Sequence, residues 1–357
     1  MKRFKIITSA VLAALMLLAM AAPAFAEDGA IEGSFRFLTY NVAGLGLTGS
    51  NALAAKQGWI GEALKNDGAN IVATQEDFSQ TDMISEKWGV AYRTHAQSNP
   101  VTGDGLNIYS ETPIYNVARE GWNKKGGAIW EGDIVSQKGV MMAVVELQKG
   151  VYVDVYNLHA DAFGGQESRE ARYDNFAQTV AFVKSHSKDH AVIITGDFNC
   201  AFHFGEPEGK DLYNKFIEQL GMRDAWTDVV NGGSFTDYSA YKGSYWGSWD
   251  SVECVLYRSS DTLTLTPETH DYLWFRQESN GMDLSDHAAA AVNFRYTASA
   301  AAEETGLTPA GPERISFIKV LQIVFADLKY AFSHFDEVIA MLKYANNTEY
   351  LYEHYSR

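Results

Sequence analysis

Four β-rich segments of this sequence end in polar, mostly ionisable residues, and a fifth segment begins with them. The polar ends read 39-TYNV-42, 74-TQED-77, 157-NLHAD-161 and 196-GDFN-199, and the fifth segment begins with 285-SDH-287. In the clearest case, 192-VIITGDFNC-200, alternation along a strand sends Asp197 and Asn199 to the same side. A buried carboxylate without a partner is unfavourable, so we expect a cation, hydrogen-bond donors or both beside Asp197.

The residues between these segments predict an alternation of strands and helices. Lys149 and Gly150 separate two β-rich runs, a pattern typical of a hairpin. This order predicts an α/β domain over residues 27–296, with two stacked sheets covered by helices. Strands are expected over 35–42, 71–77, 140–147, 151–161, 191–198, 251–258 and 287–296, and helices near 51–70, 170–186 and 210–220.

The first 26 residues have the pattern of a secretory signal peptide. The basic start MKRFK precedes an apolar run that ends with the small residues Ala24 and Ala26. A retained transmembrane helix is the alternative, but the run lacks a stop-transfer flank. After about residue 300 no run is long and apolar enough to span a bilayer. We therefore expect a secreted protein, cleaved near Ala26, without a transmembrane segment.

The chain is strongly acidic, with a formal net charge of −16 at pH 7. Removal of the leader takes away Lys2, Arg3 and Lys5 and no acid, which makes the remaining chain more negative still. Such a charge argues against a general binder of duplex DNA, because that attraction comes from Lys and Arg. It does not exclude a phosphate substrate, since bound divalent cations can supply a local positive field. The charge therefore favours a metal-dependent site.

Only two cysteines are present, Cys200 and Cys254. Two cysteines are too few for a disulfide-stapled scaffold, although they could form one bridge in an oxidising compartment. Each lies close to a candidate catalytic segment. The sequence leaves both states open, a bridge and a pair of thiols.

The last 61 residues differ in composition from the rest of the chain. Residues 297–312 are small, polar and rich in Pro and Gly, which predicts a linker. Residues 313–357 predict an amphipathic helix that docks on the domain or pairs with its own continuation; a self-association or membrane-surface element is the alternative. The prediction rests on two series of residues spaced by seven: Phe317, Val324, Ala331 and Val338, and Leu321, Leu328, Phe335 and Leu342.

Each polar residue at the strand ends has an ordinary structural explanation when it is considered alone. Asn41 could be a turn residue, Glu76 a helix cap, His159 a core histidine and Asp286 a turn cap. In this order and spacing, however, the set YN, QE, LH, GDFN and SDH resembles the endonuclease/exonuclease/phosphatase superfamily. Members include pancreatic deoxyribonuclease, apurinic endonucleases, neutral sphingomyelinases and inositol polyphosphate phosphatases. The resemblance covers about residues 35–296.

The resemblance implies a four-layer α/β sandwich with an active site at one edge of two sheets. It also implies hydrolysis of a phosphoester with one or two divalent ions, usually Mg²⁺, with Mn²⁺ as the alternative. Glu76 matches the metal-binding glutamate, Asn41 helps to hold the metal or the phosphate, and Asp286 serves a metal or polar role. Asp197 and Asn199 match the pair that orients the nucleophile and contacts phosphate oxygens.

Two histidines complete the site that the resemblance implies. His287 matches the residue that activates the attacking water and needs an acid to orient its ring, for which Asp250 is the candidate. His159 matches the histidine that donates to the phosphate or the leaving group. The acidic partner of His159 stays open, and the acids considered for it are Asp104, Glu111 and Asp161.

Substrate specificity lies in loops, so the resemblance fixes the bond type and not the molecule. The aromatic clusters 245-YWGSW-249 and 272-YLWF-275 lie near catalytic segments, and Trp246 and Trp249 are candidate substrate contacts, with plain packing as the alternative. We expect a metal-dependent phosphodiesterase that cleaves a phospholipid headgroup, with an extracellular deoxyribonuclease as the alternative. A non-catalytic binding or assembly protein is disfavoured, because it would be expected to lack one or more of the acids and histidines.

Overall fold

The computed structural model describes most of the chain between residues 30 and 344. The described ranges are 30–44, 51–78, 80–95, 103–127, 133, 136–187, 189–200, 207–230, 232–233, 252–302, 304–312 and 316–344. The expected signal peptide, and the candidate site residues Trp246, Trp249 and Asp250, lie outside these ranges.

Two six-stranded sheets form the centre of the molecule. In the first sheet the strand order is β11-β12-β1-β2-β4-β3, and in the second it is β5-β6-β7-β8-β10-β9. The strands of the first sheet are β1 (Ile31–Asn41), β2 (Ile71–Gln75), β3 (Tyr92–Arg93), β4 (Asn107–Ser110), β11 (Leu263–Leu273) and β12 (Ala289–Ala298). Those of the second are β5 (Ile114–Gly121), β6 (Gly139–Gln148), β7 (Val151–His159), β8 (Ala191–Asp197), β9 (Arg223–Asp224) and β10 (Glu253–Arg258).

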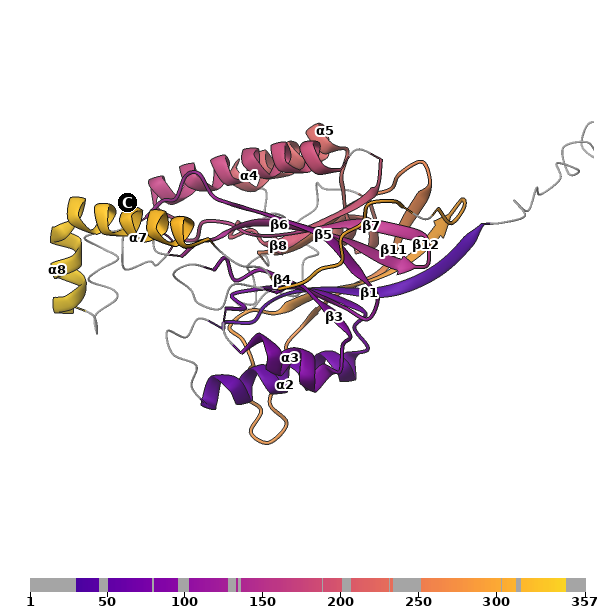
Figure 1. The fold of residues 1–357 in the computed structure, drawn as a ribbon, viewed down its shortest axis with the longest axis horizontal. Coiled ribbons are helices and arrows are strands. Elements are labelled where there is room, and N and C mark those ends of the chain that lie inside the picture. Colours follow the sequence, from indigo (N-terminus) through magenta and orange to yellow (C-terminus); the bar gives the residue numbers. More distant parts are fainter. Residues whose placement is uncertain are drawn as a thin grey trace, which may run out of the picture.

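Helices cover the outer faces of both sheets, as Figure 1 shows. Helices α2 (Asn51–Asp67) and α3 (Thr81–Trp88) cover the first sheet, while α4 (Gln166–His186) and α5 (Pro207–Leu220) cover the second. The short helix α6 (Ala225–Val229) follows β9. The predicted four-layer α/β sandwich is therefore confirmed.

Strand alternation explains why each sheet packs on both faces. In β1, Phe35 and Phe37 enter the core between the two sheets, whereas Leu38 and Tyr40 pack against the helices α2 and α3. The polar residue Asn41 falls on the same side as Phe37, so it ends the strand facing the space between the sheets. The strands thus deliver their terminal polar residues into the gap between the two sheets.

Several elements were not predicted from the sequence. Strand β4 has only four residues, and its sequence NIYS lacks a clear apolar alternation. Strand β11 contains Pro267, beside which its pairing with β12 shifts in register. Because β11 is the edge strand of its sheet, it tolerates a residue without a backbone N–H.

The segment predicted as a linker is held against the second sheet along part of its length. Asn116 in β5 donates its backbone N–H to the carbonyl of Thr308 at 2.8 Å, and Ala310 donates to the carbonyl of Ile114 at 2.8 Å. Glu304 bonds to His190, whose other ring nitrogen lies 2.7 Å from Asp154 Oδ1. We call residues 304–310 the C-terminal strap.

The chain then forms two helices where one amphipathic helix was expected. Helix α7 (Phe317–Ser333) ends at His334, which has φ −124° and ψ 42°, and α8 (Phe335–Tyr344) follows it. Figure 1 shows α8 leaving the end of α7 at a steep angle. None of the helices in the described part of the chain combines the length and hydrophobicity needed to cross a bilayer.

Candidate active site

The polar residues at the strand ends come together at one edge of the sandwich. Strand β1 runs parallel to β2 in one sheet, and β7 runs parallel to β8 in the other. The carboxyl ends of parallel strands lie at the same edge of a sheet, and contacts between Asn41 and Asp197 show that the two edges adjoin. The fold therefore brings the polar ends of the four segments together.

Asn41 lies at the centre of this cluster. Its Nδ2 atom is 3.2 Å from Glu76 Oε1, 3.0 Å from Asp197 Oδ2 and 3.5 Å from His287 Nε2. The Oδ1 atom accepts the backbone N–H of Ala43 at 3.0 Å, which fixes the orientation of the amide. One amide thus connects groups from both sheets.

Asp197 is a buried carboxylate, as its position in the sequence predicts. Its pKa is raised to about 6, chiefly by burial and also by Glu253, although His287, Lys138 and the Asn41 amide act to lower it. Oδ1 of Asp197 accepts the backbone N–H of Asn199 at 3.0 Å. Asn41 therefore supplies one of the donors expected beside Asp197, and His287 supplies positive charge when it is protonated.

The expectation that Asn199 follows the alternation of the strand does not describe its position. Strand β8 ends at Asp197, and Asn199 has a positive φ of 48°. Its side chain donates from Nδ2 to the carbonyl of Ala160 at 3.0 Å. Asn199 therefore lies beside the cluster, and its direction is set by the turn after the strand.

His159 is fully enclosed next to Asp197. Its Nε2 atom lies 3.4 Å from Asp197 Oδ2, and its carbonyl accepts a hydrogen bond from the Trp122 indole at 2.7 Å. Burial lowers the pKa of His159 well below its usual value, and the charges of Lys138 and His287 lower it further. Nδ1 of His159 has no hydrogen-bond partner in the described part of the chain.

The three acids considered as partners of His159 bind other groups. Asp104 accepts from the Arg119 guanidinium at 2.8 Å, Glu111 accepts from the Asn70 amide at 2.6 Å, and Asp161 accepts the backbone N–H of Gly126 at 2.8 Å. Burial, with Asp133 nearby, raises the pKa of Asp161 to about 7. Asp161 is the nearest of the three in sequence, and it orders the loop at residue 126.

His287 pairs with an acid other than the predicted one. Its Nδ1 atom lies 2.5 Å from Glu253 Oε1, and its Nε2 atom lies 3.9 Å from Asp197 Oδ2. Burial opposes protonation of the ring, but Glu253, Asp197 and Asp286 raise the pKa of His287 to about 10. The predicted partner, Asp250, lies three residues before Glu253 and outside the described residues.

The position of Glu253 carries a signal that could have identified it. Glu253 is the first residue of β10 and has the same side-chain direction as Val255 and Tyr257, which belong to the core between the sheets. In the register of β10 with β8, it lies directly opposite Asp197. An acid on the core-facing side of an apolar strand is thus a sequence signal that indicates a site residue.

Two lysines also approach the cluster and were not predicted. Buried Lys138 pairs with Asp133, and this acid raises the lysine pKa although burial acts to lower it. Lys56 donates from Nζ to the carbonyl of Ala43 at 2.6 Å, and burial lowers its pKa. Both lysines interact electrostatically with Glu76, so they add positive charge to an otherwise acidic edge.

The donor set fits a divalent cation bound by oxygen ligands. Asp197, Glu253 and His287 each offer an atom within 4.8 Å of the others. Because Nδ1 of His287 already bonds to Glu253, the carboxylates around Asn41, including Glu76, are the better ligands for a hard ion such as Mg²⁺ or Mn²⁺. Asp286 is exposed, and its predicted role in metal binding stays a prediction.

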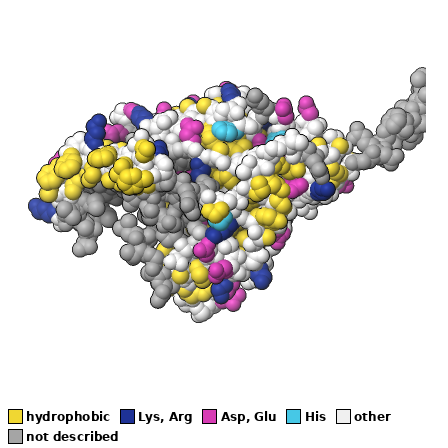
Figure 2. Space-filling model, viewed as in Figure 1, with side chains coloured by type: hydrophobic (Ala, Val, Ile, Leu, Met, Phe, Trp, Pro, Cys, Tyr) yellow, Lys and Arg dark blue, Asp and Glu magenta, His cyan; other side chains and the backbone are white. Residues whose placement is uncertain are grey.

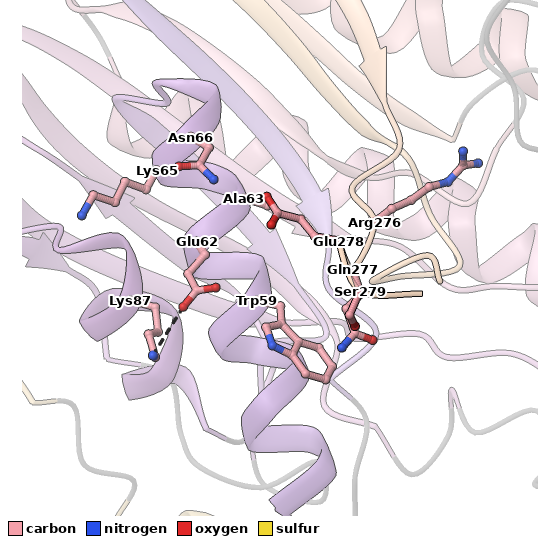
Figure 3. A pocket seen from close by; sticks show the side chains of 10 residues that line it. All are labelled: Trp59, Glu62, Ala63, Lys65, Asn66, Lys87, Arg276, Gln277, Glu278 and Ser279. Carbon is pink, nitrogen blue, oxygen red and sulfur yellow. Dashed lines mark ion pairs between the residues drawn. The ribbon is translucent and has the colours of Figure 1, made fainter. Parts of the chain in front are cut away.

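A second hollow lies away from this cluster, between α2 and the loop after β11 (Figure 3). It has a volume of about 550 Å³ and contains Trp59, Lys65 and the ion pair Glu62–Lys87 at 3.4 Å. None of the strand-end residues described above lines it. Its charged side chains are spread around an open surface and do not converge on one point.

Comparison with known proteins gives one group of sequence relatives. Sphingomyelinases of Mycobacterium tuberculosis and Mycobacterium bovis are 29% identical to the chain over 279 residues, which is 75% of this chain and 54% of theirs. The chain therefore spans about half the length of the curated relatives that it matches. No family model matches it.

Solved structures show the same fold at low sequence identity. TDP2 of D. rerio, complexed with a single-strand DNA product, superposes with a TM-score of 0.56 at 14% identity, over 73% of this chain and 99% of that chain. The beta toxin of Staphylococcus aureus gives a TM-score of 0.52 at 19% identity, over 72% of this chain and 99% of that one. The chain therefore shares its fold with these structures, and its sequence is similar to that of the mycobacterial sphingomyelinases.

Proposed function

We propose that the protein is a divalent-metal-dependent phosphodiesterase that cleaves the headgroup of a phospholipid. The observation that carries this proposal is the group around Asn41, in which Glu76, Asp197 and the His287–Glu253 pair meet between the two sheets. A phosphodiester needs a positioned water, a base for its proton and compensation of charge on the phosphoryl oxygens. This group offers residues for each of these requirements.

His287 is the proposed base. Its Nδ1 is held by Glu253, which fixes the ring tautomer and leaves Nε2 directed toward the cluster, 3.5 Å from Asn41 Nδ2. The ring can take the proton of the attacking water only from its neutral form. The neighbouring acids raise its pKa to about 10, and a divalent cation bound at this edge would lower the pKa of His287 by electrostatic repulsion.

The remaining residues position the substrate and the nucleophile. Asp197 accepts hydrogen bonds and orients the water, while Asn41 and Asn199 contact phosphoryl oxygens. His159, held neutral by burial, can donate from Nε2 toward the phosphate or the leaving group. A cation bound by Glu76, with Asn41, would supply electrostatic stabilisation of the charge that develops on phosphorus-bound oxygens.

The sphingomyelinase match favours a phospholipid headgroup as the substrate. The acidic charge of −16 also disfavours a long polyanion such as DNA. A deoxyribonuclease remains the second candidate, because TDP2, a structural neighbour, is complexed with single-strand DNA product. Trp246 and Trp249 are proposed substrate contacts in either case, and the leader pattern supports action outside the cell.

Hydrolysis of three substrates tests the proposal: sphingomyelin, plasmid DNA and bis-p-nitrophenyl phosphate. With Mg²⁺ or Mn²⁺ we expect release of the headgroup from sphingomyelin, and no activity in excess chelator. Glu76→Ala and His287→Ala should each lower kcat/KM by about a hundredfold or more. Glu62→Ala, an exposed acid of the hollow in Figure 3, is the matched control and should retain activity. Full activity in chelator would refute a metal-dependent mechanism, and cleavage of plasmid alone would favour the nuclease.

A further inference from the structure

Helix α7 carries its apolar stripe on the side that faces away from the protein. Seven of its large apolar residues are between 38% and 76% exposed: Phe317, Ile318, Leu321, Val324, Phe325, Leu328 and Phe332. At 3.6 residues per turn these positions fall within about 120° of the helix circumference. A surface helix ordinarily turns such a stripe toward the core. Figure 2 shows hydrophobic side chains gathered at the end of the molecule where α7 and α8 lie.

The opposite side of α7 rests on the segment that supports His159. Ile323, which is 6% exposed, and Tyr330 line a cleft of about 360 Å³ with Trp122 and Lys125. Tyr330 donates its hydroxyl to the carbonyl of Gly127 at 3.2 Å. Because the Trp122 indole bonds to the carbonyl of His159, the cleft beneath α7 adjoins the segment that carries this candidate site residue.

The shape of the hydrophobic surface fits a plane better than a second helix. It continues into α8 through Phe335 and Ile339, which are 60% and 47% exposed. The break at His334 turns α8 away from α7, so the apolar residues spread over two directions and do not form the single seam of a coiled coil. Apolar side chains that are distributed over two helices in this way can insert together into a lipid surface.

The charges of this region also select the kind of lipid surface. Residues 316–344 contain three lysines and three acids, whereas the whole chain carries −16. An acidic body is repelled by anionic lipids, but a region without net charge is not repelled by zwitterionic headgroups. Phosphatidylcholine and sphingomyelin have such headgroups.

We infer that the outward stripe of α7, with Phe335 and Ile339 of α8, inserts into a zwitterionic phospholipid surface and holds the catalytic edge against it. This inference deepens the proposed function and rests on it for its biological meaning, since a headgroup substrate lies in that surface. The docking itself needs no catalysis. It can therefore be measured in a chelator, independently of the activity.

Vesicle sedimentation in chelator is the direct test, with the chain from residue 27 onward and vesicles of phosphatidylcholine and sphingomyelin. The test variant is Phe317→Ser/Phe325→Ser/Phe332→Ser. The matched control, Tyr92→Ser/Val230→Ser/Met282→Ser, replaces three exposed apolar residues elsewhere on the molecule. We expect unchanged binding for the control and binding at least about tenfold weaker for the test variant. Equal binding by all three proteins would overturn the inference.

Two further measurements keep the outcomes apart. The emission of a fluorophore attached at Phe325→Cys should shift to the blue when vesicles are added, whereas emission from Val230→Cys should not shift. If the emission at Phe325→Cys does not shift, the result counts against docking even if the triple variant misfolds. Light scattering tests the alternative that the stripe of α7 binds a second copy of this chain. If the triple variant loses a dimer that the wild type forms, while its vesicle binding is unchanged, the stripe is a dimer interface. If vesicle binding depends on the stripe but no phosphodiester is cleaved, the proposed function fails and the docking stands.

Discussion

Glu253 reaches His287 across the gap between the two sheets. It belongs to β10 in one sheet, and His287 lies two residues before β12 in the other. The contact at 2.5 Å is therefore a tertiary interaction between residues that are 34 positions apart in the sequence. A carboxylate at this place holds the imidazole in one tautomer and supports its protonated form during the reaction.

Replacing Glu253 by glutamine tests whether Glu253 or the predicted partner, Asp250, orients His287. In Glu253→Gln the negative charge beside His287 is lost, so the pKa of His287 falls and the acidic limb of the kcat/KM profile moves to lower pH. We also expect kcat to fall by about a hundredfold. The matched variant Asp250→Asn should leave the profile in place. If the pH profile of kcat/KM shifts in Asp250→Asn and stays normal in Glu253→Gln, Asp250 is the acid that orients His287.

Residue identity predicted the members of the cluster better than their pairing. The order and spacing of the polar strand ends, with the family resemblance that they carry, predict Asn41, Glu76, His159, Asp197 and His287, and the fold brings these residues together. The partner of His287 depends instead on the register of β10 against β8, which local sequence does not specify. Lys138 and Lys56 were missed for the same reason, since each contacts the site through tertiary structure alone.

At the scale of elements, β8 depends on a glycine immediately before Asp197. Gly196 has φ 140°, and a Cβ atom there would lie 1.9 Å from the carbonyl oxygen of Leu158 in β7. A side chain at this position would push the two parallel strands apart where they deliver His159 and Asp197. The glycine therefore permits the close backbone approach that the site needs.

Substitution of this glycine should affect stability and activity together. We expect Gly196→Ala to lower the free energy of unfolding by about 2 kcal/mol or more, because backbone must move against backbone. Activity should fall as well, since the displacement reaches Asp197. Gly311→Ala, where nothing lies within 4 Å of the added Cβ, is the control and should be neutral. Urea denaturation of the three proteins gives the comparison, and equal midpoints would contradict the prediction.

The long regular elements were predictable from periodicity, while interruptions were not. Helices α2, α4 and α5 and strands β6 and β7 fall close to their expected ranges. The helix break at His334 leaves no mark in the seven-residue spacing, which continues through Phe335 and Val338. Edge strand β11 and the short β4 are stabilised by pairing with their neighbours, so their own sequences carried too little signal.

At the scale of the whole molecule, the C-terminal strap joins the sandwich to α7 and α8. His190 connects the two parts, because one ring nitrogen bonds to Asp154 in β7 and the other to Glu304 in the strap. The hydrogen bond to Asp154 raises the pKa of His190 to about 9, although burial opposes the rise. The strap is therefore held most firmly while this imidazole is charged.

This contact predicts a stability that depends on pH. Because the folded-state pKa of about 9 exceeds the ordinary value, the contribution is complete below about pH 6.5 and is lost as the pH rises through 9. With His190 partly exposed, we expect about 1 kcal/mol at most. The difference in melting temperature between the wild type and His190→Gln should therefore shrink from about pH 6 to about pH 10. A constant difference across this range would show that the charge contributes nothing.

The division of the site between the two sheets has a consequence for how the protein loses activity. Asn41, Glu76 and His287 belong to the first sheet or its ends, and His159, Asp197 and Glu253 to the second. A small slide of one sheet over the other would separate donors from acceptors while every strand kept its ladder of hydrogen bonds. The proposed phosphodiesterase activity would thus be a measure of sheet alignment, and during heating it should disappear before the circular dichroism of the strands changes.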